Sequence, residues 1–390
     1  MKDKIKVMYL TTTSKLCGTE KILMELAKRI DKEHFDTMVV TIKDDLQEGL
    51  LEKIKGKGIK TACLKVHKRW KFYKLWRLFS LIKEFKPDII ESFLFFDNIL
   101  VRIFGKLMRV PVIISGQRNV EINRSFFRNL LDKSTIKLAD LIVSNTERGK
   151  DLLVKKYGID CDQIKVINNG IEIEEENNSV QKKELLSEAD LPGLTGNEKI
   201  VGFIGRLEKQ KGVQYLLDAM RIINKEDPSV YALIIGDGKE RENLQKYAKS
   251  SGDNSSNIVF SGWKDNVLQY LKLFNILVLP SLWEGMPNVV LEAMLEEVPV
   301  IATNIGGTVE IIDDGENGFL VAPGNSLLLA DKIKYVLLLS DNERQRITSA
   351  AKNRVISNFN IERMVREFED TYYALLSTKN SDIDREVRKY

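Results

Sequence analysis

The chain has 390 residues, of which 43% are hydrophobic and 30% charged, with a formal net charge of +4. This length allows two domains of ordinary size. Three widely separated cysteines, Cys17, Cys63 and Cys161, exclude a disulfide framework and a zinc-type ligand spacing, and they favour a reducing cytoplasm. No run approaches 18 uncharged apolar residues, and the apolar run at the start is too short for a signal peptide. We therefore expect a cytoplasmic protein without a membrane span.

The first half of the chain alternates short apolar runs with helical patterns, which predicts a parallel sheet with helices on both faces. The second half repeats this pattern. The polar stretch between the halves, residues 172–199, is predicted to be a hinge segment with a short helix around residues 182–189. The expected strands are residues 4–10, 35–42, 59–66, 88–93, 112–115, 141–144, 165–167, 200–204, 230–235, 258–261 and 276–279.

Residues 60–86 carry nine Lys or Arg residues against one acidic residue, Glu84. Aromatic residues are interleaved with them, namely Trp70, Phe72, Tyr73 and Trp76. Two interpretations remain open. One is a solvated basic helix whose aromatic side chains pack inward. The other is attachment to an anionic membrane surface, because basic residues with Trp and Phe on a short helix can lie in a lipid interface. No nucleic-acid-binding motif accompanies the stretch, so we expect no nucleic-acid partner.

Two cations follow the first strand of the second half. The loop 205–212 begins and ends with glycine and contains Arg206 and Lys211. Loops that follow parallel strands lie at the carboxyl edge of the sheet, where ligands bind, so these cations are well placed to grip a diphosphate. The next strand ends in Gly236-Asp237-Gly238, which is half of a dinucleotide fingerprint and weak by itself.

Residues 281–294 follow a buried strand and contain two glutamates, Glu284 in a loop and Glu292 in the predicted helix behind it. Asn288 is predicted to cap this helix. The free N–H groups of its first turn, from Val289 onward, would then form an anion site at the positive end of the helix.

Glu284 and Glu292 enclose seven residues that include Gly285-Met286-Pro287-Asn288. This pattern resembles the E-x7-E element of retaining GT-B glycosyltransferases, in particular family GT4. In that family the first glutamate holds hydroxyls of the donor sugar and the second holds the ribose of the nucleotide. The loop with Arg206 and Lys211 is similar to the family's Gly-Arg-Leu…Lys-Gly element, whose cations neutralise the leaving nucleoside diphosphate.

The resemblance implies a GT-B fold, that is, two Rossmann-like domains facing each other across a cleft. Residues 1–171 would bind the acceptor and residues 200–360 the nucleotide-sugar, with the hinge segment 172–199 between them. Residues 361–390 would form a C-terminal helix that returns to the first domain.

The resemblance also implies site residues. The catalytic residues would be Glu284, Arg206 and Lys211. Donor contacts would come from Gly18, Gly205, Gly236, Val267, Gly285, Met286, Pro287, Asn288, Val289 and Glu292. Arg118 and Asn119 would lie on the acceptor side. The chain departs from the family in two ways. Cys17 replaces the first glycine of the N-terminal loop, and neither His34 nor His67 lies where many members place a histidine beside the anomeric centre.

The predicted activity is retaining transfer of a hexose or N-acetylhexosamine from a nucleotide-sugar, UDP being favoured over GDP. The acceptor would be a glycan or a lipid-linked glycan of cell-envelope polysaccharide synthesis. No metal or other cofactor is expected, because Asp160-Cys161-Asp162, which spells D-x-D, lies away from the other chemistry. Two alternatives stay open: an epimerase or phosphorylase with the same fold, and a non-catalytic nucleotide-binding partner subunit.

Overall fold

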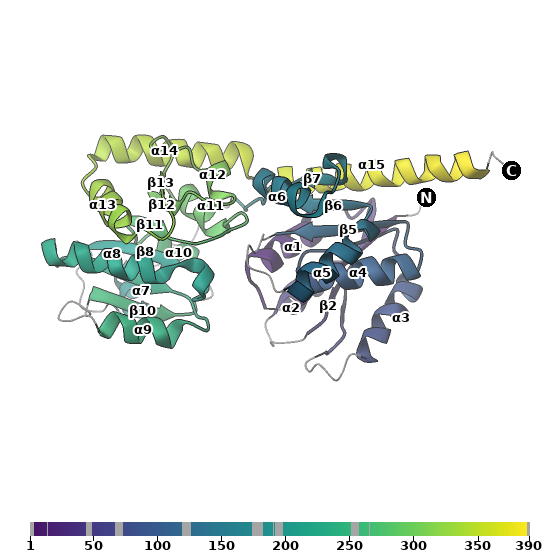
Figure 1. The fold of residues 1–390 in the computed structure, drawn as a ribbon, viewed down its shortest axis with the longest axis horizontal. Coiled ribbons are helices and arrows are strands. Elements are labelled where there is room, and N and C mark those ends of the chain that lie inside the picture. The colour runs from purple at the N-terminus through teal and green to yellow at the C-terminus, as the bar shows by residue number, and fades with distance from the viewer. Residues whose placement is uncertain are drawn as a thin grey trace. The chain divides into compact units, whose positions relative to one another are not determined.

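The computed structural model describes residues 4–13, 15–43, 49–66, 73–118, 126–173, 182–189, 191, 198–250, 257–264 and 266–387. The chain forms two compact units (Figure 1). Unit 1 comprises Met1–Gly170 and Ile361–Tyr390, and unit 2 comprises Ile171–Asn360. Each is an α/β unit with its own parallel sheet, as the alternation of strand and helix patterns predicts.

Unit 1 contains a seven-stranded sheet in the order β3-β2-β1-β4-β5-β6-β7. Every described pairing is parallel. The strands between the two edges are short, largely buried runs rich in β-branched residues, which suits a sheet covered on both faces, whereas β3 at one edge is exposed or half-buried. The strands are β1 (Ile5–Thr11), β2 (Phe35–Thr41), β3 (Lys60–Cys63), β4 (Ile89–Ser92), β5 (Val112–Gln117), β6 (Leu141–Ser144) and β7 (Ile164–Val166).

Two apolar layers cover the faces of this sheet, since alternate residues of a strand point to opposite sides. Val7 and Tyr9 of β1 pack with one set of helices, and Met8 and Leu10 pack with the other. The first set is α1 (Gly18–Arg29), α2 (Leu50–Ile54) and α15 (Ile361–Val387). The second set is α3 (Trp76–Phe85), α4 (Phe95–Leu107), η2 (Ile136–Leu138) and α6 (Glu147–Tyr157). Helix α5 (Phe126–Thr135) precedes η2 and contacts α4.

The C-terminal helix α15 belongs to unit 1, along which it runs in yellow in Figure 1. Its apolar stripe enters the core of unit 1 through Ile361, Met364, Val365, Phe368 and Tyr372. The spacing of these residues is that of one helix face, which is why the sequence pattern predicts this helix.

Unit 2 contains a six-stranded parallel sheet in the order β10-β9-β8-β11-β12-β13. Its strands are β8 (Lys199–Ile204), β9 (Val230–Ile235), β10 (Ile258–Gly262), β11 (Ile276–Leu279), β12 (Val300–Thr303) and β13 (Phe319–Val321). The helices are α7 (Lys182–Glu188), α8 (Val213–Glu226), α9 (Arg241–Lys249), α10 (Leu268–Leu271), α11 (Asn288–Leu295), α12 (Thr308–Ile311), α13 (Ser326–Leu337) and α14 (Asp341–Asn358). Short 3-10 turns η3 (Cys161–Gln163) and η4 (Lys209–Lys211) occur in units 1 and 2 respectively.

The described part of the predicted hinge segment packs on unit 2. Leu185 and Leu186 of α7 are buried in the core of unit 2, and Leu191 joins them. These leucines provide the apolar contacts that fix this stretch on unit 2, although the residues around them are polar.

In both sheets the strand order reverses direction at the first strand of the unit. In unit 1, β1 lies between β2 and β4, and in unit 2, β8 lies between β9 and β11. The loops that follow β1 and β4, and those that follow β8 and β11, therefore diverge at a topological switch point, where open α/β sheets bind ligands.

Candidate active site

The predicted site residues of unit 2 gather on loops at the carboxyl edge of its sheet. Lys211 follows β8 and Glu284 follows β11, so they stand on the two sides of the switch point. The backbone joins these loops directly, because the Leu282 N–H donates to the Gln210 carbonyl at 2.7 Å. A third loop is tied in where the Gly307 N–H donates to the carbonyl of Gly285 at 2.8 Å.

Lys211 and Glu284 form an ion pair in this edge. The Lys211 Nζ lies 2.5 Å from the Glu284 Oε1, and the side chains are 13% and 7% exposed. Ser281 Oγ donates to the same carboxylate oxygen at 2.6 Å. Gln210 Nε2 lies 3.5 Å from the Glu284 Oε2 and donates to the Trp283 carbonyl at 2.9 Å. The carboxylate is thus held from both sides, with its partners supplied by two loops.

Glycines allow these loops to approach one another closely. Gly236 has a φ of +137°, and a Cβ there would lie 1.9 Å from the Gly205 carbonyl oxygen. Gly306 has a φ of +45°, and a Cβ there would lie 2.0 Å from the carbonyl oxygen of Glu284. No side chain fits at either position, so both glycines define where the loops of the site can run.

Arg206 shares the loop of Lys211 but has a different environment. Its side chain is half-exposed, and its Nη1 lies 3.8 Å from the Glu208 carboxylate. Contacts at this distance between exposed groups contribute little to stability. The structure therefore leaves the guanidinium at the surface, on the same loop as Lys211.

Helix α11 begins one residue earlier than predicted. The N-cap is Pro287, with extended backbone and no side-chain cap bond, and Asn288 is the first helical residue. The prediction that Asn288 caps the helix was therefore wrong. Proline has a fixed φ and no N–H to lose at a helix start, and its carbonyl accepts from the Val290 N–H at 3.1 Å. The remaining predicted donor contacts on this stretch lie in the loop and on the helix, with Met286 buried and both Val289 and Glu292 half-buried.

Val267 lies on a different loop, the one that follows β10. It is the N-cap of the short helix α10 and packs against the core of unit 2. The neighbouring Asp265 is outside the described residues. The role of Val267 as a donor contact stays a prediction.

Unit 1 has a polar cluster at its own switch point. Cys17 is the N-cap of α1, and Gly18 is its first residue. Thr12, on the loop after β1, donates through its hydroxyl to Asp97 in the first turn of α4. Burial raises the pKa of Asp97 to about 8, and its second oxygen, Oδ2, has no hydrogen-bond partner within the described part of the chain. Sequence reasoning missed Asp97, although an acidic residue in the apolar stretch 93–101 was a usable signal.

Arg118, predicted on the acceptor side, is almost fully buried at the end of β5. Its guanidinium lies 5.0 Å from the ring of Phe93 and 5.8 Å from that of Phe368, and Nη1 donates to Asn169 Oδ1 at 2.9 Å. Burial lowers the pKa of Arg118 to about 10. Its Nε and Nη2 have no partner among the residues that the structure describes, and Asn119 falls outside them.

Unit 1 has another buried carboxyl besides Asp97, namely Glu91 of β4, which lies near Arg118. The sequence patterns did not single it out. The hydroxyl of Tyr372, on α15, donates to its Oε2. Burial raises the pKa of Glu91 to about 7 in spite of this bond and of the charge of Arg118. Helix α15 therefore supplies hydrogen-bonding as well as apolar contacts to unit 1.

Two family models match this chain. Residues 188–354 match Glycosyl transferases group 1, and residues 17–175 match Glycosyltransferase Family 4. The chain is a group 1 glycosyltransferase. The predicted group 1 glycosyltransferase and its enzyme class are thereby confirmed, whereas the assignment to family GT4 in particular stays a prediction.

Two curated relatives align with nearly the whole length of this glycosyltransferase. It is 25% identical to UDP-Gal:alpha-D-GlcNAc-diphosphoundecaprenol alpha-1,3-galactosyltransferase of Escherichia coli, with 97% of this chain and 99% of that protein aligned. It is 26% identical to GalNAc-alpha-(1->4)-GalNAc-alpha-(1->3)-diNAcBac-PP-undecaprenol alpha-1,4-N-acetyl-D-galactosaminyltransferase of Campylobacter jejuni, with 93% and 97% aligned. Among solved structures, Anabaena Alr3699/HepE in complex with UDP and glucose has a TM-score of 0.81 at 20% identity, covering 95% of this chain and all of that one. The fold is GT-B, as predicted.

The basic segment of the glycosyltransferase, residues 60–86, is described except for residues 67–72, which include Trp70 and Phe72. Tyr73 and Trp76 are exposed, and the Trp76 ring contacts Phe79 edge-on. The interpretation in which these aromatic residues pack inward is wrong for Tyr73 and Trp76. Helix α3 instead buries Leu78, Ile82 and Phe85, since these aliphatic and aromatic residues form its inward stripe.

Neither a metal cluster nor a membrane-spanning helix is found in the part of the glycosyltransferase that the structure describes. No group of three or more His, Cys, Asp or Glu residues is placed to hold a metal ion there. Asp160 and Asp162, the D-x-D residues, are exposed around η3, before β7 at the edge of the sheet. None of the described helices is long and apolar enough to cross a bilayer.

Proposed function

We propose that this glycosyltransferase moves a hexose or N-acetylhexosamine from a UDP-sugar to a lipid-diphosphate-linked glycan, with retention at the anomeric carbon. Unit 2 would bind the donor and unit 1 the acceptor. The reaction would serve the synthesis of a cell-envelope polysaccharide.

The observation that carries this proposal is the ion pair of Lys211 and Glu284 at the switch point of unit 2. Departure of a sugar from a nucleoside diphosphate builds negative charge on the leaving phosphate. Lys211 and the half-exposed Arg206 are suited to stabilise that charge, and Glu284 is suited to accept hydrogen bonds from sugar hydroxyls. Because Ser281 and Lys211 already fix Glu284, little reorganisation is required when the donor binds, which is the condition for electrostatic catalysis.

The names of two full-length relatives support the choice of donor and acceptor. The Escherichia coli relative is named for UDP-galactose, and both relatives are named for acceptors linked through a diphosphate to undecaprenol. Both names also specify α linkages. UDP-hexoses such as UDP-galactose carry an α-linked sugar, so retention is the simplest route to such products. A front-face path, in which the leaving phosphate takes the proton of the acceptor hydroxyl, suits a chain without a histidine at the predicted position.

We propose that no metal ion takes part. Lys211, Arg206 and the first turn of α11 would neutralise the leaving diphosphate, as cationic side chains and helix ends do at other phosphate sites. Activity in the presence of EDTA tests this.

We also propose that the enzyme binds the inner face of the cell membrane through its basic segment. Tyr73 and Trp76 lie exposed there, beside exposed Arg77 and Lys83. Each Lys or Arg near an anionic surface contributes about 1 kcal/mol. Such a surface would bring the enzyme to a lipid-linked acceptor.

The deciding experiment incubates the purified protein with UDP-hexoses and UDP-N-acetylhexosamines, with and without a short-chain GlcNAc-diphosphate lipid. Mass spectrometry detects the product, and NMR reports its anomeric configuration. We expect UDP release only with acceptor, and an α-linked product. Cleavage of UDP-sugar without acceptor would instead indicate an epimerase or hydrolase, and breakdown dependent on inorganic phosphate would indicate a phosphorylase. Nucleotide binding without any turnover would indicate a non-catalytic subunit.

A further inference from the structure

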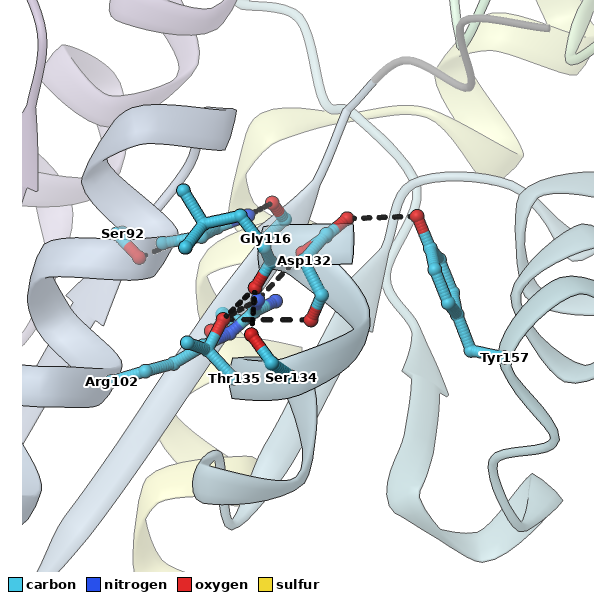
Figure 2. A network of polar contacts seen from close by, with 10 residues as sticks. Ser92, Arg102, Gly116, Asp132, Ser134, Thr135 and Tyr157 are labelled. Carbon is cyan, nitrogen blue, oxygen red and sulfur yellow. Dashed lines mark hydrogen bonds and ion pairs between the residues drawn. The ribbon is translucent and has the colours of Figure 1, made fainter. Parts of the chain in front are cut away.

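Helix α5 of unit 1 turns its polar side inward. Asp132 and Thr135 are its buried residues, and Figure 2 shows them facing Arg102 of α4. The Arg102 Nη1 lies 2.6 Å from the Asp132 Oδ1, with both side chains at most 2% exposed. Tyr157 donates from α6 to the other carboxylate oxygen at 3.0 Å. The inner side of α5 is therefore held by a buried ion pair and hydrogen bonds.

The apolar side of α5 points outward. Phe126, Phe127, Leu130 and Leu131 are 75%, 80%, 54% and 43% exposed. In an amphipathic helix of a globular domain such residues face the core. Four large apolar side chains exposed within six residues of one helix are typical of a surface that binds a partner or a membrane.

The buried ion pair explains why α5 does not rotate about its axis to bury its apolar side. Rotating the apolar side inward would bring Asp132 out and leave Arg102 charged and without its carboxylate in the core. Leaving one member of a buried ion pair alone is strongly destabilising. Arg102 is fixed in addition by Ser115, whose Oγ accepts from Nε at 2.9 Å. The exposure of the apolar side is thus built into the packing of α4 against α5.

The charges around this side match an anionic surface. Residues 126–138 contain three exposed cations, Arg128, Lys133 and Lys137, and one acidic residue, Asp132, which is buried. Lys156 of α6 adds a further cation beside the helix, where its Nζ lies 2.7 Å from Asn129 Oδ1. Aromatic and aliphatic side chains flanked by cations are the composition of a helix that lies in a bilayer interface.

Helix α5 and the basic segment lie on the same side of the sheet of unit 1. The helix α3 of that segment, α4 and the turn η2 that follows α5 all contribute to the same apolar layer on one face of the sheet. Membrane contact through α3 and through α5 would therefore use the same face of unit 1.

We propose that α5 is a membrane-insertion helix, whose residues Phe126, Phe127, Leu130 and Leu131 enter the headgroup–acyl boundary of an anionic bilayer. Arg128 and Lys133 then lie at the lipid phosphates. This deepens the proposed membrane attachment and rests on it. The basic segment supplies attraction that salt weakens, whereas insertion of α5 supplies apolar burial that salt does not weaken.

The test measures cosedimentation of the full chain with phosphatidylglycerol–phosphatidylcholine vesicles over a salt series. We compare wild type, Leu130→Gln/Leu131→Gln, and the control Leu327→Gln/Leu338→Gln, which changes two leucines of unit 2 that are 66% and 78% exposed. The α5 variant should bind at least about tenfold more weakly, equivalent to about 1.4 kcal/mol, with the largest loss at high salt. The control should bind as wild type does. Equal binding of the α5 variant and wild type overturns the proposal.

A second measurement does not depend on a loss of binding. Phe127→Trp keeps the side chain apolar, and its added fluorescence should be quenched by lipids brominated along the acyl chain, beyond the quenching of wild type. No added quenching overturns the proposal. The proposal is also overturned if wild type is a dimer that does not bind vesicles and the α5 variant is a monomer, because a second copy of the chain then covers α5.

Vesicle binding needs neither donor nor acceptor, so these results stand whether or not the proposed transfer reaction is found.

Discussion

Lys211 and Glu284 connect the two sides of the switch point in unit 2, with 2.5 Å between Nζ and Oε1. The lysine follows β8 and the glutamate follows β11, and these strands are neighbours in the sheet although 73 residues separate the two side chains. One residue suited to the leaving diphosphate and one suited to the sugar are thus fixed to each other before any substrate binds.

Replacing Lys211 with methionine should reduce turnover by on the order of a hundredfold, since a preorganised charge that stabilises the leaving group is lost. The chain should also become less stable, because Glu284 stays largely buried without its cation. Steady-state kinetics and urea unfolding measure the two effects. The control is Lys334→Met, which breaks an exposed ion pair of the same unit with Glu226. Wild-type turnover in Lys211→Met contradicts the assigned role.

Arg206→Ala should lower turnover without lowering stability, because this side chain is half-exposed and has only a distant carboxylate beside it. Kinetics in EDTA should give the same rates as kinetics without it. An absolute requirement for Mg²⁺ would show that the cations of the loop are not sufficient, and Asp160 and Asp162 would then need to be tested.

Gly306→Ala should displace Glu284 although residue 306 is not itself a predicted catalytic or donor-binding residue. The new Cβ would lie 2.0 Å from the Glu284 carbonyl oxygen, so the loop that carries the carboxylate has to move. We expect turnover to fall together with thermal stability. Gly315→Ala is the matched control. It has a φ of +79° but no atom within 4 Å, and it should cost only about 1–2 kcal/mol of stability without a change in turnover. Equal turnover of both variants would rule out this loop contact as a determinant of the site.

Asp97 should make unit 1 less stable as the pH rises. Its folded-state pKa of about 8 lies above its ordinary value of 3.8, so the folded chain keeps a proton that the unfolded chain loses. The free energy of unfolding therefore decreases as the pH rises through the interval between these two values. In Asp97→Asn this contribution is absent. Between about pH 5 and about pH 8, the stability of wild type should fall relative to that of the variant by on the order of a few kcal/mol. Urea unfolding at both values checks it. A constant difference between the two proteins would mean that Asp97 does not bind the proton.

Most of the fold could be predicted because its strands are short apolar runs between turn signals. The runs ending at Ile235 and Leu279 match β9 and β11 to the residue. The order of the strands within each sheet could not be read in this way, because it depends on which runs become neighbours. The sequence pattern placed the predicted start of α11 one residue too late. Capping propensity favours asparagine, and it does not take into account the fixed φ of Pro287, which is the N-cap in the structure.

The sequence patterns indicated the charged residues of the candidate site but not the residues that hold them in place. Glu284 and Lys211 stand in recognisable patterns, but Ser281 and Gln210 became partners of Glu284 only once two distant loops met. The orientation of α5 was equally hidden. In a globular domain the apolar residues Phe126, Phe127, Leu130 and Leu131 of such a helix would ordinarily face the core. The pairing of Asp132 with Arg102, 30 residues earlier, holds the opposite side inward and cannot be read from the local pattern.

The division of labour between the two glutamates tests the account most directly. Turnover and the dissociation constant of UDP are measured for wild type, Glu284→Ala, Glu292→Gln and the control Glu226→Gln, with the donor identified by the screen. We predict that Glu284→Ala chiefly loses turnover and still binds UDP, because alignment of the sugar matters most during transfer. Glu292→Gln should chiefly lose affinity for UDP, and Glu226→Gln should match wild type. Equal turnover of wild type and Glu284→Ala would contradict the assignment of the donor site.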